Sequence, residues 1–182
     1  MEQAKQRMME GNLFKARSGR VTARVPAYGY KLVDAQGNEG PNARKETYYA
    51  IRDNESVIVR RIYERFLSGD SMRRIALDLE MEGINPPKQY KHWEYVQIRL
   101  ILINEVYQGD FYAHRWLHTV VQKPSNDGLS TRQVKCKVER PRDEWIHIPV
   151  PAIISREDWA AANALLAKNK KTCVVMRRSR IC

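Results

Sequence analysis

Long apolar runs and paired cysteines are both missing from this sequence of 182 residues. No stretch approaches the roughly 18 apolar residues that a membrane-spanning helix needs, and the opening MEQAKQRMMEGN lacks the apolar core of a signal peptide. The three cysteines, Cys136, Cys173 and Cys182, are an odd number without CxxC spacing. We therefore expect a cytoplasmic protein with reduced thiols, no membrane partner and no complete zinc site.

Catalytic motifs are absent as well. The sequence contains no GxSxG, Walker A or HExxH motif. His114 and His118 have an i, i+4 spacing, but they fall in an expected strand, where that spacing does not make a ligand pair. The sequence thus predicts no catalytic residue, no metal site and no cofactor within this chain.

Negative charge is scarce at both ends of the chain. Lys and Arg number 32 against 21 Asp and Glu, which gives a net charge of +11. Residues 1–50 and 111–182 hold the excess, whereas residues 51–110 are close to neutral. A surplus of this size favours a polyanionic partner such as nucleic acid.

A basic segment without any acidic residue runs from position 15 to position 31. Gly19, Pro26 and Gly29 oppose regular helix there. We expect residues 19–47 to form an extended arm that lies in a DNA minor groove, where A·T tracts attract guanidinium groups. The alternative is a solubilising linker, which would have no reason to exclude acids. The candidate DNA contacts here are Arg17, Arg20, Arg24 and Tyr28.

The middle of the chain predicts three short helices after a strand at Tyr48–Ile51. Asp53-Asn54 and Ser71 are expected N-caps, and glycines 69 and 83 are expected terminators. The third helix is expected from about Glu94 to Asn104. Three short helices with tight connections are typical of a helix-turn-helix or winged-helix module. The expected inward residues are Ile58, Val59, Ile62, Tyr63, Phe66, Leu67, Ile75, Ala76, Leu79, Ile98, Ile101 and Leu102.

The third helix is a candidate for reading the major groove. Its side opposite the core is expected to present Tyr95, Gln97 and Arg99, types that contact base edges or phosphates. Lys88 and Lys91, in the preceding loop, would lie near the DNA backbone. The alternative is an ordinary amphipathic helix of a small core. Exposure of Leu100 and Ile103 would require either a partner or contact with thymine methyl groups.

The flanking segments complete an expected α+β fold: a winged-helix-like helical core with an antiparallel β wing and flanking helices. A first helix is expected from Glu2 to about Lys15, interrupted by Gly11. Period-two alternation predicts a hairpin formed by strands at 111–114 and 134–138, with Lys135 and Lys137 on one face, followed by a strand at DEWIHIPVP. Ser155 and Asp158 begin a last helix, and residues 169–182 are expected to be a basic linker.

These segments resemble the large serine recombinases in their order and spacing. GRVTARVPAYGYK resembles the segment that follows the catalytic domain in that family, and IVRRIYERFLSGDSMRRIALDLEMEGINPP resembles the start of its recombinase domain. Trp93 and the string IRLILINEVYQGDFY resemble a later motif of that domain, and WIHIPVPAIISREDWAAANALL resembles its closing strand and helix. The similarity spans nearly the whole chain.

The resemblance implies a domain that binds double-stranded DNA at an attachment half-site, in a bacterial or phage-encoded protein. Residues 1–18 would be the end of a helix leaving the catalytic domain, which holds the family's reactive serine, and residues 48–168 the recombinase domain. A zinc ribbon would follow, so the full-length protein is expected to bind zinc, with Cys182 as a stranded ligand. The fragment alone is expected to be monomeric and not catalytic, and the full-length protein a dimer or tetramer on DNA.

Two other functions remain open. A free-standing winged-helix transcription regulator would dimerise by itself and bind a palindromic operator. An RNA-binding basic domain would prefer single-stranded RNA, although no RNP-like aromatic strand is visible.

Overall fold

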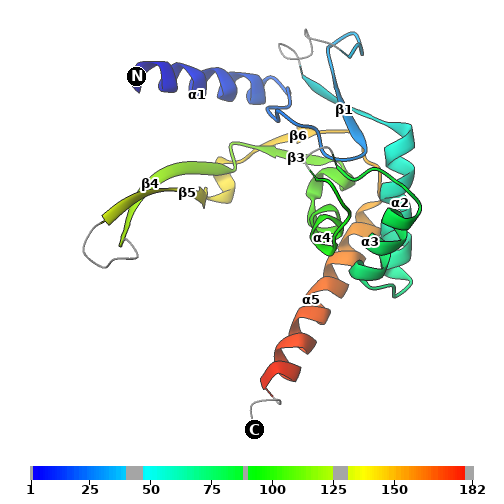
Figure 1. Ribbon diagram of the computed structural model, residues 1–182. Coiled ribbons are helices and arrows are strands. Elements are labelled where there is room, and N and C mark those ends of the chain that lie inside the picture. Colours follow the sequence, from blue (N-terminus) through cyan, green and yellow to red (C-terminus); the bar gives the residue numbers. More distant parts are fainter. Residues whose placement is uncertain (1, 40–46, 88–89, 125–130, 179–182) are drawn as a thin grey trace. The chain divides into compact units, whose positions relative to one another are not determined.

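The structure is a computed structural model that describes residues 2–39, 47–87, 90–124 and 131–178 (Figure 1). The chain forms two compact units. Unit 1 comprises Met1–Thr22 and Phe111–Ile148, and unit 2 comprises Ala23–Asp110 and Pro149–Cys182. Both contain helices and small antiparallel sheets, so the expected α+β class is confirmed. None of the described helices is long and apolar enough to cross a membrane.

Among its described residues, unit 2 contains four α-helices and one two-stranded sheet. The sheet pairs β1 (Tyr30–Val33) with β2 (Tyr48–Ile51) in antiparallel register, with Tyr30 opposite Ile51. The helices are α2 (Asp53–Leu67), α3 (Met72–Met81), α4 (Tyr95–Ile103) and α5 (Arg156–Arg178), and a 3-10 turn (Glu105–Gln108) follows α4. The expected strand at 48–51 and the three expected middle helices are confirmed. The strand that begins at Tyr30 was not expected from the sequence.

Local signals explain where these helices begin and end. Ser71 accepts a hydrogen bond from the backbone N–H of Arg74, which is the expected cap of α3. The expected cap of α2 is wrong: Arg52 occupies the N-cap position and its side chain makes no capping hydrogen bond, whereas Asp53 lies in the first turn, where its charge suits the helix dipole. Gly69 has a φ of 105° just beyond α2, a conformation that favours glycine.

Buried tyrosines hold the core of unit 2 together. Tyr63 donates to the carbonyl oxygens of Ile101 and Leu102 at 3.1 and 3.2 Å, near the C-terminal end of α4. These carbonyls lie in the last turn of a helix, where carbonyl groups lack partners within the helix. Tyr30 likewise donates to the carbonyls of Val106 and Pro151, at 3.0 and 2.7 Å. The hydroxyls therefore tie segments that are far apart in sequence, and burial raises the pKa of Tyr30 and Tyr63.

Unit 1 contains the first helix and most of the later strands. Helix α1 (Glu2–Arg17) continues through Gly11, contrary to the expected interruption; one glycine costs a helix only about 1 kcal/mol. The hairpin is formed by β4 (Trp116–Pro124) and β5 (Thr131–Glu139). Strand β3 (Asp110–Ala113) pairs instead with β6 (Ile146–Pro149), and a 3-10 turn (Arg142–Glu144) precedes β6. The expected pairing of 111–114 with 134–138 is therefore wrong, because His114, with φ of 57°, ends β3.

The last helix begins as expected and ends later than expected. Ser155 accepts a hydrogen bond from the N–H of Asp158 at 3.0 Å. Ala162 is buried, and Trp159, Leu165 and Leu166 are half-buried. Residues 169–178, expected to be a linker, continue α5, since the helix contains neither glycine nor proline between Arg156 and Arg178.

Candidate nucleic-acid interface

Helix α4 presents an exposed face with both polar and apolar side chains. Ile98, Ile101 and Leu102 are buried, as expected, which leaves the opposite side of the helix open. Tyr95 is 45% exposed, and the guanidinium of Arg73 lies 5.6 Å from the centre of its ring. The exposed residues of α4 are Tyr95, Val96, Arg99, Leu100 and Ile103. This face offers one cation, one phenol and three aliphatic groups.

Gln97 does not belong to that face. Its side chain is only 4% exposed, and its Oε1 accepts a hydrogen bond from the backbone N–H of Glu94 at 2.8 Å. Glu94 in turn accepts from the backbone of Gln97, so the two residues form a capping box. The prediction that Gln97 points outward is therefore wrong: it is the third helical residue, where a glutamine can turn back to the N-cap.

The loop before α4 is fixed by Glu80 of α3. Its carboxylate accepts from the backbone N–H of Trp93 at 2.9 Å and lies 2.8 Å from Nδ1 of His92. The hydrogen bond from Trp93, followed by that of His92, lowers the pKa of Glu80. Lys91 is exposed next to this anchored corner, as its predicted role requires. Lys88 lies outside the described residues.

The predicted arm is divided between the two units. Arg17 is exposed and Arg20 is half-buried in unit 1, whereas Arg24 is exposed and Tyr28 is half-buried in unit 2. As expected, residues 18–29 contain no helix. Tyr28 packs inward: its hydroxyl donates to the carbonyl of Asn85 at 3.2 Å, and its ring meets Trp93 edge-on at 5.4 Å. Desolvation, with a smaller effect of Glu55, raises the pKa of Tyr28 to about 12. The phenol is thus neutral and anchors the end of the arm.

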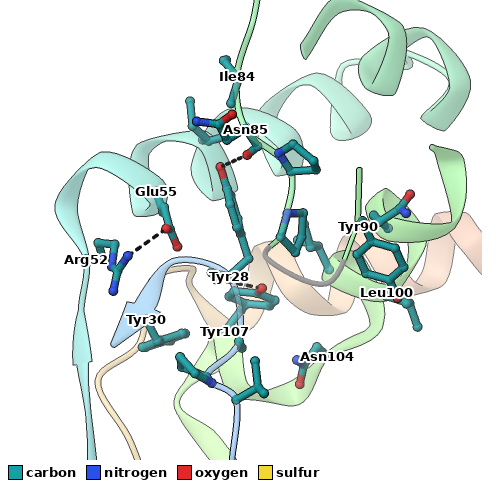
Figure 2. Close-up of a pocket in the computed structure, with 18 of the residues that line it drawn as sticks. Tyr28, Tyr30, Arg52, Glu55, Ile84, Asn85, Tyr90, Leu100, Asn104 and Tyr107 are labelled. Carbon is teal, nitrogen blue, oxygen red and sulfur yellow. Dashed lines mark hydrogen bonds and ion pairs between the residues drawn. The ribbon is translucent and has the colours of Figure 1, made fainter. Parts of the chain in front are cut away.

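A pocket of about 740 Å³ lies beside Tyr28 in unit 2 (Figure 2). Its wall includes Tyr90 and Leu100, together with Asn104 at the C-terminal end of α4. At another edge, Glu55 accepts from the backbone N–H of Gly29 at 2.9 Å and pairs with Arg52 at 3.3 Å. The pocket therefore joins the end of the arm to the exposed face of α4.

In unit 1, the hairpin of β4 and β5 carries the predicted lysines. Residues directly opposite in the register share a face, so His118 with Lys137 and Val120 with Lys135 lie on the same side. Both lysines are exposed. Nζ of Lys137 lies 4.0 Å from the centre of the Trp116 ring. The hairpin thus has a basic face, as expected from the sequence.

Sequence reasoning missed a series of stacked cations and rings in unit 1. Arg115 lies 5.1 Å from the ring of Trp116 and 4.5 Å from that of Trp145. Arg142 lies 5.2 Å from Trp145 and 5.8 Å from Tyr112. Such contacts stabilise by about 0.5–1 kcal/mol each when exposed. The signal available was the closeness of basic and aromatic residues in HRW and RPRDEW, which alternation alone does not detect.

Metal chemistry has no visible site in the described part of the chain. No group of three or more His, Cys, Asp or Glu side chains among the described residues is placed to hold a metal ion. Cys136 is a half-buried free thiol. Cys182, the predicted stranded zinc ligand, lies outside the described residues.

Comparison with known proteins decides the family. A family model described as Recombinase matches residues 53–169, which is more than half of the chain. The chain belongs to the Recombinase family. The match begins at the first residue of α2 and ends within α5. It therefore includes the loop before α4, α4 itself and the strand pairs β3–β6 and β4–β5. The family resemblance seen in the sequence is confirmed.

Relatives of this Recombinase-family chain are longer than the chain itself. A Bacillus subtilis (strain 168) protein named "Putative DNA recombinase" is 28% identical over 172 residues, which is 92% of this chain and 32% of the relative. The chain thus spans about one third of that protein's length. Two solved structures share the fold at 19% identity: "Crystal Structure of a LSR-DNA Complex" (TM-score 0.52, covering 89% of this chain and 38% of that one) and "Sequence Requirements of the Listeria innocua prophage attP site" (TM-score 0.50, 88% and 51%).

Proposed function

We propose that this chain binds double-stranded DNA, as the domain of a large serine recombinase that recognises an attachment half-site for site-specific integration or excision. The supporting observation is the exposed face of α4. Its arginine, tyrosine and aliphatic groups stand on a helix whose first turn is fixed by a capping box and whose preceding loop is anchored by Glu80. A rigid, partly basic helix of this kind fits a major groove.

The basic residues outside α4 supply the second part of the proposal. Arg17, Arg20 and Arg24 contact the minor groove and the phosphates through the arm, and Lys135 and Lys137 contact phosphates through the basic face of the hairpin. Such contacts are sequence-independent and depend on salt. Sequence preference comes from α4, with Tyr95 and Arg99 as the reading residues and Lys91 at the adjacent backbone. Tyr28 contributes by fixing the end of the arm.

The first test measures affinity for a duplex of mixed sequence by fluorescence anisotropy at 50 and 200 mM salt. If 6–10 phosphates are contacted, affinity falls about 10³–10⁵-fold between the two salt concentrations. The double variant Arg20→Ala, Arg24→Ala is expected to bind more weakly and with a shallower salt dependence. Arg61→Ala is the matched control, because its lost charge is paired with Glu82 on the surface. Equal affinity of the double variant and the wild type excludes the arm as a DNA contact.

The second test addresses recognition. Sequences bound from a random duplex pool are compared for the wild type and Arg99→Ala, since a lost bidentate base contact changes discrimination by about 1–3 kcal/mol. Identical sequence profiles exclude Arg99 as a reading residue. Binding to a palindrome by a dimer that forms without DNA would favour a free-standing regulator instead, and mass measurement in solution detects that dimer.

A further inference from the structure

Helix α4 carries a row of aliphatic side chains on its exposed face. Val96, Leu100 and Ile103 follow one another at i, i+4 and i+7, so they form one continuous line along the helix. They are 39%, 44% and 36% exposed. This line, here called the aliphatic stripe, lies opposite the buried side chains of α4. Packing of the core therefore does not account for it.

The aliphatic stripe is unusual for a side of a helix that faces water. Such a side is ordinarily polar, and a helix that is apolar on all sides is ordinarily buried on all sides. Val96 and Ile103 are β-branched, and this type is a poorer helix former than lysine or glutamate, so helix propensity does not explain their presence either. The stripe has the composition of a surface that another molecule covers.

The size of the aliphatic stripe argues against a second protein as that molecule. Three aliphatic side chains, each about two-fifths exposed, offer roughly 100 Å² of apolar surface. Stable interfaces between proteins bury about 1,200 Å² or more in total. The stripe is thus large enough to cover a few methyl groups, and much smaller than a protein–protein interface.

The cations beside the aliphatic stripe favour an anionic partner. Arg99 is exposed on the same face of α4, and Arg73 of α3 lies over the neighbouring Tyr95 ring at 5.6 Å from its centre. Lys91 is exposed in the loop before the helix. In duplex DNA, phosphates border the groove and the base edges form its floor. An aliphatic centre with cations at its edges matches that arrangement.

Two carboxylates lie just beyond the ends of α4. Glu94 is the N-cap, and its carboxylate accepts a hydrogen bond from the backbone N–H of Gln97. Glu105 is half-buried in the turn that follows the helix. Within α4 itself, Tyr95–Ile103, the one charged residue is Arg99. The helix that carries the stripe is therefore positive.

Thymine is the base whose chemistry fits an aliphatic stripe. In the major groove every base pair presents hydrogen-bonding groups, and thymine adds an apolar group, its C5 methyl. Val96 and Ile103 are seven residues apart, which is about 10 Å along the helix axis. Base pairs are stacked about 3.4 Å apart, so the stripe has the length of about three base steps.

We propose that Val96, Leu100 and Ile103 contact thymine methyl groups in the major groove, so that the recognised half-site carries A·T pairs where the stripe lies. This inference rests on the proposed function and deepens it. Arg99 and Tyr95 offer polar contacts, whereas the stripe selects one base by its methyl group. Loss of one methyl contact is expected to lower affinity about fourfold, the effect of exposing one methyl-sized group to water.

The test removes the methyl group alone. Deoxyuridine pairs with adenine and presents the same donors and acceptors as thymidine, but it lacks the C5 methyl. The full chain first selects a duplex from a random pool, and each thymidine of that duplex is then replaced in turn by deoxyuridine. Fluorescence anisotropy at one salt concentration measures each affinity. About two or three neighbouring replacements are expected to weaken binding about fourfold each, and the others to have no effect.

Variants of the stripe show which side chain reads each methyl group. Val96→Ala and Leu100→Ala are each expected to bind the thymidine and deoxyuridine duplexes equally at one position, because the methyl group there has lost its partner. Val57→Ala, at an exposed valine of α2, is the matched control and is expected to keep the wild-type ratio at every position. Urea denaturation checks that each variant is folded. Ile103→Val removes a single methylene and serves if an alanine variant unfolds.

Three results overturn the proposal while DNA binding stands. These are a selected pool without preference for thymine, replacements that all leave affinity unchanged, and stripe variants that keep the wild-type ratio at every thymidine. In the last case the methyl groups act through DNA shape or another residue, and the stripe is left to a protein partner. If the chain binds no duplex at any salt concentration, the proposed function fails as well, so the two failures are distinguishable.

Discussion

The hydroxyl of Tyr107 donates a hydrogen bond to the backbone carbonyl of Tyr28, 2.9 Å away. Tyr107 is buried, and burial, followed by the neighbouring tyrosines, raises its pKa well above the ordinary value. The bond joins the turn after α4 to the end of the predicted arm (Figure 2). The position of the arm in unit 2 thus depends on a core residue that touches no proposed ligand.

Replacing Tyr107 by Phe is expected to destabilise the protein by about 1–2 kcal/mol, because the carbonyl of Tyr28 loses its partner in a partly buried setting. Urea denaturation measures the change. Tyr95→Phe removes a hydroxyl from an exposed ring and is expected to change stability by no more than about 0.5 kcal/mol. Equal effects of the two substitutions contradict this role for Tyr107.

Alanine at two glycines is expected to act in opposite directions. Gly29 has a φ of 89°, and a β carbon there would lie 3.1 Å from the side chains of Ile153 and Val59. Gly29→Ala is therefore expected to cost about 1–2 kcal/mol from backbone strain alone. Gly11 lies within α1, and a β carbon there would meet no atom within 4 Å, so Gly11→Ala is expected to stabilise that helix by about 0.5–1 kcal/mol. Thermal melting of the two variants checks the signs.

Gln97 and Arg99 are expected to separate stability from DNA binding. Gln97→Ala breaks the capping box of α4 and is expected to cost about 1 kcal/mol of stability. Arg99 is exposed, so Arg99→Ala is expected to leave stability within about 0.5 kcal/mol and to change binding instead. Urea midpoints and anisotropy are measured for both variants. A Gln97→Ala protein of normal stability with altered sequence preference would show that Gln97 reads DNA rather than capping α4.

Low pH is expected to weaken the hydrogen bonds through which Glu80 holds the loop before α4. The folded protein lowers the pKa of Glu80, so the unfolded chain binds this proton more tightly. The stabilisation is complete above the ordinary carboxyl pKa and is lost as pH falls through the lowered value. Glu80→Gln is expected to reduce the loss of stability between pH 7 and pH 3. Part of the loss of stability remains in this variant, because arginine partners also lower the pKa values of Asp78 and Glu82.

The outcome that contradicts this role is a curve of unfolding free energy against pH for Glu80→Gln that runs parallel to the wild-type curve. In that case the hydrogen bonds of Glu80 to Trp93 and His92 do not stabilise the folded state.

Much of the fold followed from periodicity in the sequence. The helices after Ser71 and before Asn104, and the buried residues Ile98, Ile101 and Leu102, were predictable because an amphipathic pattern determines which face is buried. Strand pairing was not, since alternation predicts a strand but not its neighbour. The left-handed backbone at His114 separated β3 from β4, and histidine, although enriched in that conformation, is a much weaker sign of it than glycine.

The candidate site was predicted in part. Exposure of Tyr95, Arg99 and the hairpin lysines followed from their spacing. The inward positions of Gln97 and Tyr28 did not, because each is held by a hydrogen bond to one particular backbone group. Such bonds depend on the local path of the chain, to which hydrophobic spacing is insensitive.

The backbone N–H of Val150 donates to the carbonyl of Gly109 at 2.9 Å, one residue outside each end of the segment 110–149. The chain therefore leaves unit 2 and returns to it at adjacent points. Both residues of this hydrogen bond, Gly109 and Val150, belong to unit 2. A segment whose ends are joined can change in length with little effect on the backbone that it leaves and re-enters. The β4–β5 hairpin, with Lys135 and Lys137, and helix α4 can therefore change separately in evolution.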